Sequence, residues 1–187
     1  MTLALCVDVG GTRLRAALLE AACKTELLGD WPAPGDLEAF RRLVADLIDA
    51  HGVSRIGVAV PGLASGSVCR WAPNLPYLNG LDLARMFFGV TVALGNDAQL
   101  ALLAEAALGA ARNASDVILL AIGTGIGSAV LADGRIVHGP SGAAASFGWA
   151  CADPADRGDD ALGWLERNAS GTALDAIARC AGCTDAR

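Results

Sequence analysis

Residues 117–137 read VILLAIGTGIGSAVLADGRIV, and they repeat in outline a pattern already present at residues 3–19, LALCVDVGGTRLRAALL. Each stretch contains an apolar run typical of a β-strand, a short glycine-rich turn and a second apolar run. The later stretch continues through Asp133-Gly134, a dipeptide typical of a tight hairpin. This internal repeat predicts a fold built from two related halves, each with one glycine-rich turn between two strands.

Strands and helices are expected to alternate along the rest of the chain. Apolar residues recur at helical spacing from Leu37 to Ile48, after Asp36, which can cap a helix that ends near His51-Gly52. An alanine-rich helix is expected from Asn96-Asp97 to about residue 111. The other expected elements are strands at 26–31, 55–60 and 90–94, short helices at 81–88, 162–167 and 172–179, and a loop-rich segment from 61 to 76. This alternation predicts an α/β protein.

The boundary between the two halves is expected near residues 112–116. The sequence there, Arg-Asn-Ala-Ser-Asp, is a polar run that follows the long alanine-rich helix. We therefore predict an N-terminal domain at residues 1–112 and a second domain at residues 113–187.

Composition and charge limit the classes of function. The net charge of -6 and the absence of a Lys/Arg cluster argue against a nucleic-acid partner. The long uncharged apolar stretch at residues 117–132 is interrupted by glycines, so no membrane segment is expected. The first residues lack the basic region of a signal peptide and carry Asp8, and the six cysteines are scattered. These features predict a cytoplasmic protein with reduced thiols.

The first glycine-rich turn has the chemistry of a phosphate site. Gly10 and Gly11 allow backbone N–H groups to approach an anion, while Thr12 offers a hydroxyl and Asp8 a carboxylate for Mg²⁺. The alternative is an ordinary hairpin turn with a solvated Asp8, and for this motif alone the two readings have about equal weight. The second turn, residues 123–127, has the same two readings, and the pairing of the two turns favours phosphate binding.

Asn96-Asp97 stands where a strand is expected to give way to a helix. Either residue can simply cap that helix, and for the dipeptide alone this is the favoured interpretation. A kinase, however, needs a carboxylate that orients and deprotonates the attacking hydroxyl. Asp97, placed between two phosphate turns, meets that requirement.

Taken together, the motifs resemble those of the ROK family of sugar kinases. In order they are DVGGT (8–12), GVAVPG (57–62), APNL (72–75), NDAQLALLAE (96–105), GTGIGSAV (123–130), HGPSGAAASFGW (138–149) and LERNASGTAL (165–174). The resemblance covers almost the whole chain. It implies a duplicated actin-like ATPase (ribonuclease H-like) fold with two lobes and a central cleft, and transfer of phosphate from Mg-ATP to a sugar hydroxyl.

The resemblance also implies roles for individual residues. Asp97 would be the general base, and Asn74, Asn96 and Glu166 would bind the sugar. The residues expected at the phosphates of ATP are Asp8 (through Mg²⁺), Gly10, Gly11, Thr12, Arg13, Gly123, Thr124, Gly125 and Gly127.

The sequence departs from the family pattern in the sugar pocket and the zinc motif. Ser146 and Trp149 replace the usual Glu and His, which puts the usual hexose specificity in question. Trp149 or Trp164 can offer a stacking face to a pyranose, although core packing is the favoured role. The region expected to carry the zinc motif reads CADPADRGDDALGW (151–164), with one cysteine. Cys180-x-x-Cys183 supplies half of a zinc site, so no zinc is expected.

The chain ends well before the length typical of the family, so the second lobe is expected to be incomplete and its apolar strands partly uncovered. We expect such a surface to be hidden in a homodimer. The family's DNA-binding repressors carry an additional module ahead of the first strand, and since this sequence starts at that strand, we expect no such module here. Two functions remain: an ATP-dependent kinase of a hexose or amino sugar, or a pseudokinase that binds sugar or nucleotide without turnover.

Overall fold

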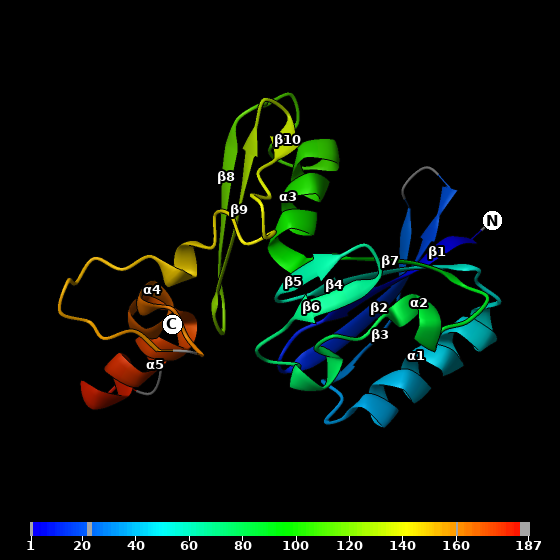
Figure 1. Ribbon diagram of the computed structural model, residues 1–187, viewed down its shortest axis with the longest axis horizontal. Helices are drawn as coiled ribbons and strands as arrows, with labels where there is room; N and C mark the ends of the chain where they lie inside the picture. The colour runs from blue at the N-terminus through cyan, green and yellow to red at the C-terminus, as the bar shows by residue number, and fades with distance from the viewer. Residues whose placement is uncertain (1, 22–23, 160, 184–187) are drawn as a thin grey trace. The chain divides into compact units, whose positions relative to one another are not determined.

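The computed structural model describes residues 2–21, 24–159 and 161–183, with the side chains of residues 2 and 3 left out (Figure 1). The chain divides into two compact units, Met1–Asp97 and Ala98–Arg187. The sequence predicted the boundary between the two units near residues 112–116. The intervening helix α3 (Asp97–Leu108) packs against strands of the second unit, which is why all but its first residue belong there.

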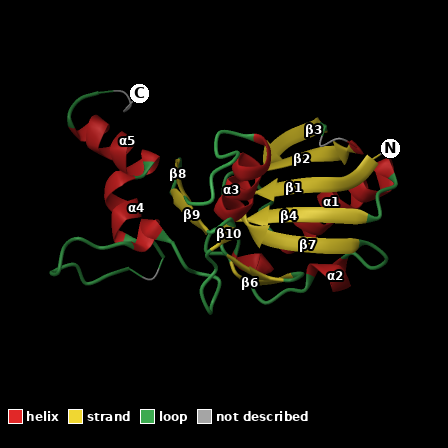
Figure 2. Cartoon of the chain, turned by 90° about the horizontal axis from the view of Figure 1, so that it is seen from above, coloured by secondary structure: helices red, strands yellow, loops and turns green. Residues whose placement is uncertain are grey.

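A five-stranded sheet forms the centre of the first unit, in the order β3-β2-β1-β4-β7 (Figure 2). Strand β1 is antiparallel to β2 on one side and parallel to β4 on the other, and β4 is parallel to β7. The strands are β1 (Thr2–Val9), β2 (Arg13–Glu20), β3 (Thr25–Pro32), β4 (Arg55–Val60) and β7 (Thr91–Asn96). The sequence predicted each of them.

Alternation along β1 explains how this sheet is covered. Leu5, Val7 and Val9 are buried on one face, because successive side chains of a strand point to opposite sides. Helix α1 (Leu37–His51) contributes buried apolar side chains to the same core, and it lies behind the sheet in Figure 2. Asp36 caps this helix by accepting a hydrogen bond of 2.8 Å from the N–H of Ala39. The predicted helix and its cap are confirmed.

The sequence predicts a loop-rich segment from residue 61 to 76, and the structure adds two short strands to it. This segment contains a small hairpin, β5 (Leu63–Ser65) and β6 (Val68–Trp71). Strands this short cannot display the alternation by which strands are recognised, and the cluster of turn-forming residues around them reads as loop. Two short helices follow, η2 (Pro76–Leu78) and α2 (Leu83–Met86).

The second unit contains the predicted repeat. Strands β8 (Val117–Ile122), β9 (Ile126–Ala132) and β10 (Arg135–Ile136) form a sheet in the order β10-β9-β8. Helix α3 packs on one face of it, where Leu102 and Leu131 are buried. The opposite face of β8 is open, with Ile118, Leu120 and Ile122 exposed by 66%, 49% and 56%. The uncovered apolar face expected from the sequence is therefore present.

The rest of the second unit consists of short helices joined by loops (Figure 1). They are η3 (Phe147–Trp149), α4 (Trp164–Ala169) and α5 (Gly171–Cys180). The described part of the chain contains no helix with the length and apolar character required to cross a bilayer.

Candidate active site

The first glycine turn joins β1 to β2. The N–H of Gly10 donates to the carbonyl of Arg13 at 2.8 Å, which closes the turn. Within residues 2–21, 24–159 and 161–183, the N–H groups of Gly11 and Thr12 have no hydrogen-bond acceptor. Two adjacent backbone donors of this kind can bind an anion such as a phosphate oxygen.

Asn74 lies directly against this turn. A Cβ added at Gly11 would come within 2.9 Å of Cβ of Asn74, so glycine is required for the approach. The segment that carries Asn74 is itself a turn, in which the N–H of Leu75 donates to the carbonyl of Ala72 at 3.1 Å. The structure thus brings a residue expected at the sugar into contact with a residue expected at the phosphates.

Asp8 stands one residue before the end of β1, opposite Arg15 on β2 and Ala59 on β4. Partial desolvation raises the pKa of its carboxyl, although the positive charge of Arg15 opposes the shift. A carboxylate and a nearby hydroxyl, that of Thr12, are oxygen donors of the type that Mg²⁺ prefers. A divalent cation beside Asp8 would favour its ionised form.

Asn96 and Asp97 lie at the same edge of the sheet as Asp8. Strands β1, β4 and β7 are parallel, and their registers align Asp8 with Ala59 and Ala59 with Gly95. The carboxyl ends of parallel strands are the usual place for ligand sites in α/β proteins. Side-chain Nδ2 of Asn96 donates to the carbonyl of Gly62 at 3.0 Å, which fixes the orientation of its amide.

Asp97 is both the last residue of the first unit and the first residue of α3. A carboxylate in the first turn of a helix interacts favourably with the helix dipole. The position of Asp97 therefore suits stabilisation of the start of α3 as well as a role as general base. The two interpretations of this residue drawn from the sequence are therefore both compatible with its place in the fold.

Arg13 does not point its charge at the turn. Its Nε lies 2.7 Å from Oδ1 of Asp30 on β3, and its Nη2 donates to the carbonyl of Asp30 at 3.1 Å. The hydrogen bond from Arg13 lowers the pKa of Asp30, so this pair is charged at neutral pH. Phosphate binding by Arg13 would require its side chain to leave Asp30.

The second glycine turn, residues 123–125, is held by the start of α5. The N–H of Gly171 donates to the carbonyl of Gly123 at 2.8 Å, and Oγ1 of Thr172 donates to the carbonyl of Thr124 at 2.9 Å. In a planar trans peptide the C=O and N–H groups point in opposite directions. The next N–H groups, those of Thr124 and Gly125, therefore point away from α5, and they have no acceptor among the described residues.

Glu166 reaches this second turn from α4. A Cβ at Gly125 would lie 2.5 Å from Oε1 of Glu166, and a Cβ at Gly148 would lie 3.1 Å from its Oε2. The carboxyl accepts a hydrogen bond from the N–H of Ile126. Burial raises the pKa of Glu166, and this hydrogen bond opposes the shift. The residue expected at the sugar is thus in contact with the second glycine turn.

Gly127 lies inside β9 rather than in the turn. A Cβ at this position would be 3.4 Å from Cβ of Ala98, the second residue of α3. Gly127 therefore allows the helix to pack closely on the strand, and this packing accounts for a glycine there.

The two residues that depart from the family pattern lie near η3. Ser146 Oγ donates to the carbonyl of Ala143 at 2.8 Å. Trp149 is 42% exposed and borders a surface cavity of about 270 Å³ together with Trp164, Asp156, Arg157 and Arg167. The expectation of core packing is wrong for Trp149, because a side chain that is 42% exposed does not lie in the core.

The sequence reading did not assign roles to Gly148, Gly171 and Thr172. All three lie in motifs that the sequence had singled out, HGPSGAAASFGW and LERNASGTAL. Ser170 is the residue from which the sequence could have indicated the start of a helix, because serine is a preferred helix cap. In the structure it caps α5, and its Oγ accepts a hydrogen bond of 3.2 Å from the N–H of Ala173. The contact of this cap with a distant turn depends on the tertiary fold.

Each unit thus presents a hairpin with a glycine turn, and the first unit continues into parallel strands whose ends carry polar residues. This is the arrangement of the actin-like ATPase fold. The sequence profile of the ROK family matches residues 4–184, and the chain belongs to this family.

Several curated proteins are similar to the chain. An N-acetylgalactosamine kinase of Shewanella sp. (strain ANA-3) is 31% identical over 152 residues, which are 76% of this chain and 49% of that protein. An N-acetylmannosamine kinase of Escherichia fergusonii is 32% identical over 188 residues, which are 94% of this chain and 64% of that protein.

A solved structure of a ROK family glucokinase from Streptomyces griseus, in complex with glucose and AMPPNP, superposes with a TM-score of 0.81 at 25% identity. The match covers 95% of this chain and 60% of that one. The chain therefore spans less than two thirds of the length of each of these three proteins.

Proposed function

We propose that the protein is an ATP-dependent sugar kinase that phosphorylates a hydroxyl of a hexose or an amino sugar. The observation that carries this proposal is the pair of glycine turns, each of which presents two adjacent N–H groups without an acceptor among the described residues. Such groups stabilise the negative charge of phosphates, and phosphoryl transfer depends mainly on positioning and charge stabilisation. The kinase names of the similar proteins support the same reaction.

In this proposal Asp97 accepts the proton of the sugar hydroxyl as its oxygen attacks the γ-phosphorus of ATP, and ADP leaves. The turn N–H groups of Gly11, Thr12, Thr124 and Gly125 bind phosphate oxygens. Asp8 and the hydroxyl of Thr12 would hold Mg²⁺, which would supply positive charge to the phosphates. This role is supported by the place of Asp8 near the end of β1 and of Thr12 in the turn that follows.

Asn74, Asn96 and Glu166 would bind sugar hydroxyls. Asn74 and Glu166 each touch a glycine of a phosphate turn, Gly11 and Gly125, so the residues for the acceptor stand next to those for the donor. An amide or carboxylate that binds hydroxyls at a fixed distance from the phosphates places the acceptor for in-line attack. We further propose that the reaction takes place in the cytoplasm and that the protein is a homodimer.

A pseudokinase that binds sugar or nucleotide without turnover is the second candidate. It is favoured by Ser146 and Trp149, because Ser146 already donates its hydroxyl to Ala143 and Trp149 offers an aromatic face in place of an imidazole. Retention of Asp8, both turns and Asp97 favours the kinase.

The decisive experiment is a coupled assay of ADP release with Mg-ATP against a panel of hexoses and hexosamines. A kinase releases ADP with one or more of these sugars, at a rate that depends on sugar concentration. Isothermal titration with the same sugars and with a non-hydrolysable ATP analogue separates the two candidates. Saturable binding without ADP release identifies the pseudokinase, and neither binding nor release contradicts both.

A further inference from the structure

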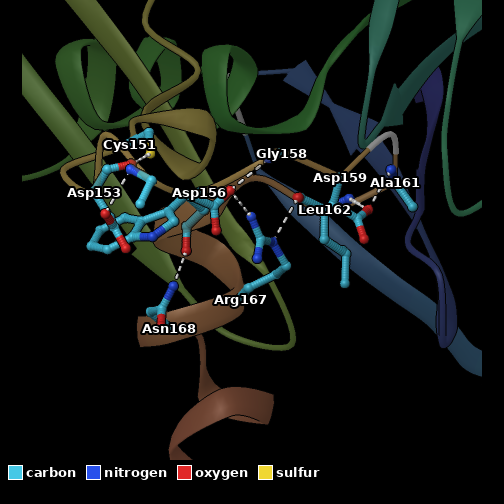
Figure 3. A network of polar contacts seen from close by, with 11 residues as sticks. Cys151, Asp153, Asp156, Gly158, Asp159, Ala161, Leu162, Arg167 and Asn168 are labelled. Carbon is cyan, nitrogen blue, oxygen red and sulfur yellow. Dashed lines mark hydrogen bonds and ion pairs between the residues drawn. The ribbon is translucent and has the colours of Figure 1, made fainter.

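Helix α4 presents two adjacent charged side chains to different neighbours. Glu166 contacts the second glycine turn, as described above, while Arg167 is directed at the loop formed by residues 150–159 and 161–163 (Figure 3). Consecutive residues of a helix are rotated by about 100°, so they face different surroundings. Any rotation or shift of α4 would therefore move both side chains from their partners.

Arg167 makes several contacts with that loop. Its Nη2 lies 2.7 Å from Oδ1 of Asp156, and its Nε donates to the carbonyl of Leu162 at 3.3 Å (Figure 3). The same Oδ1 of Asp156 accepts from the N–H of Gly158 at 2.8 Å. Asp156 thus links the guanidinium of Arg167 to the backbone of the loop, and charged partners make such hydrogen bonds strong.

The start of α4 is fixed by close backbone contacts as well. The N–H of Leu165 donates to the carbonyl of Ala150 at 3.1 Å. Gly163 lies so close to Gly148 and Trp149 that no Cβ would fit there. These contacts hold the first residues of the helix, and its end is joined to α5 by the hydrogen bond from the N–H of Ser170 to the carbonyl of Glu166 at 3.1 Å. The contacts of Glu166 and Arg167 are made by the side chains between these two ends.

We propose that Arg167, bound to Asp156, is a positioning residue that keeps the Glu166 carboxylate against the second glycine turn. It acts through α4 and touches neither the turn nor a substrate. Where it concerns the sugar, this inference rests on the proposed kinase function. The positioning of Glu166 itself is a property of the fold and can be tested without turnover.

The test uses Arg167→Met, Asp156→Asn and the double variant, with Arg157→Met as the matched control. Arg157 borders the same cavity, and no ion pair of its side chain occurs among the described residues. Asparagine has nearly the same shape as aspartate, so Asp156→Asn should fold even if Arg167→Met does not. Hydrogen–deuterium exchange is measured at residues 123–127, which include the N–H of Ile126, and at β4 as an internal reference.

We expect each single variant to accelerate exchange at residues 123–127 by about three- to tenfold, with no added effect in the double variant. Exchange at β4 and in Arg157→Met should match that of the unmodified protein. Unchanged exchange at 123–127 in Arg167→Met and Asp156→Asn would overturn the proposal. Equal acceleration in both the turn and β4 would do the same, because it would show general destabilisation.

In an active enzyme, the two variants should raise KM for the sugar with little change in kcat, the pattern of lost ground-state binding. If Arg167 only stabilised the fold, its loss would not raise KM while leaving kcat unchanged. A fall in kcat as large as the rise in KM would contradict the link to sugar binding. If the unmodified protein shows no turnover, the kinase proposal fails, while the exchange measurements still decide the role of Arg167.

Discussion

The carboxylate of Glu166 occupies the space beside Gly125 so closely that a methyl group at Gly125 would lie 2.5 Å from its Oε1. We therefore expect Gly125→Ala to displace Glu166 and to lower the stability of the fold by roughly 1–3 kcal/mol, the usual cost of overpacking. Thermal or urea unfolding measures the change. In a Glu166→Ala background the same substitution should cost less, since the clashing atoms are gone.

Gly123→Ala is the matched control for this substitution. A Cβ at Gly123 meets nothing within 4 Å, and its backbone does not require a glycine. Its effect on stability should be small. If Gly123→Ala and Gly125→Ala destabilise the protein equally, the contact with Glu166 is not the cause.

Asp97→Asn tests the general base. We expect kcat to fall by about 10²- to 10⁴-fold, because an amide cannot accept the proton of the sugar hydroxyl. Binding of the nucleotide should change little, and calorimetry with an ATP analogue measures it. Asp133→Asn, in the hairpin between β9 and β10, is the control, since Asn tolerates the left-handed backbone found there (φ 50°). Turnover that persists in Asp97→Asn would remove Asp97 from the mechanism.

The raised pKa of Glu166 gives stability a specific dependence on pH. Because the folded state binds the proton more tightly than the unfolded chain, Glu166 contributes most below the ordinary pKa of glutamate. This contribution is lost as the pH rises through the higher pKa of the folded state. We expect Glu166→Gln to flatten that part of the profile of Tm against pH. Glu26→Gln, at an exposed position of β3, should leave the profile unchanged.

The open face of β8 predicts self-association. Ile118, Leu120 and Ile122 form an exposed apolar row, and burial of apolar surface is worth about 25 cal/mol per Å². Sedimentation should show a dimer whose dissociation constant rises in Leu120→Lys. Phe88→Ser removes an apolar side chain that is 95% exposed elsewhere, and it should leave the dimer intact. A monodisperse monomer over the whole concentration range would refute the homodimer.

The purified protein should contain no stoichiometric zinc, and a chelator should leave its Tm unchanged. Cys180 and Cys183 are exposed at the end of α5 and amount to two ligands, whereas a structural zinc site needs four. His138 and Cys151 are two candidates to complete such a site. Elemental analysis that finds one zinc per chain would show that they do so.

The sequence was most informative where a pattern extends over many residues. The helix at Leu37–His51 and the repeated hairpins were predictable, because helical spacing and apolar runs reflect which side chains face a core. The β5–β6 hairpin was not predictable, since strands of three and four residues are too short to show a period.

In the candidate site, too, local patterns were predictable from the sequence and contacts between distant residues were not. The turns at Gly10–Thr12 and Gly123–Gly125 were visible because they are local motifs. The contacts that hold them were not, because Asn74, Glu166 and Thr172 reach the turns from distant parts of the chain. The engagement of Arg13 with Asp30 likewise depends on the pairing of β2 with β3, which no local pattern specifies.

The hydrogen bonds from Gly171 and Thr172 to the second turn also have an entropic consequence. A loop that is free to rotate its peptide planes must give up that freedom when it binds an anion, and the lost entropy weakens binding. Here the planes of residues 123–124 and 124–125 are already oriented by α5, so this cost is met during folding rather than during binding. If this turn binds phosphate as proposed, its affinity would therefore be set in part by α5, whose hydrogen bonds orient the two peptide planes.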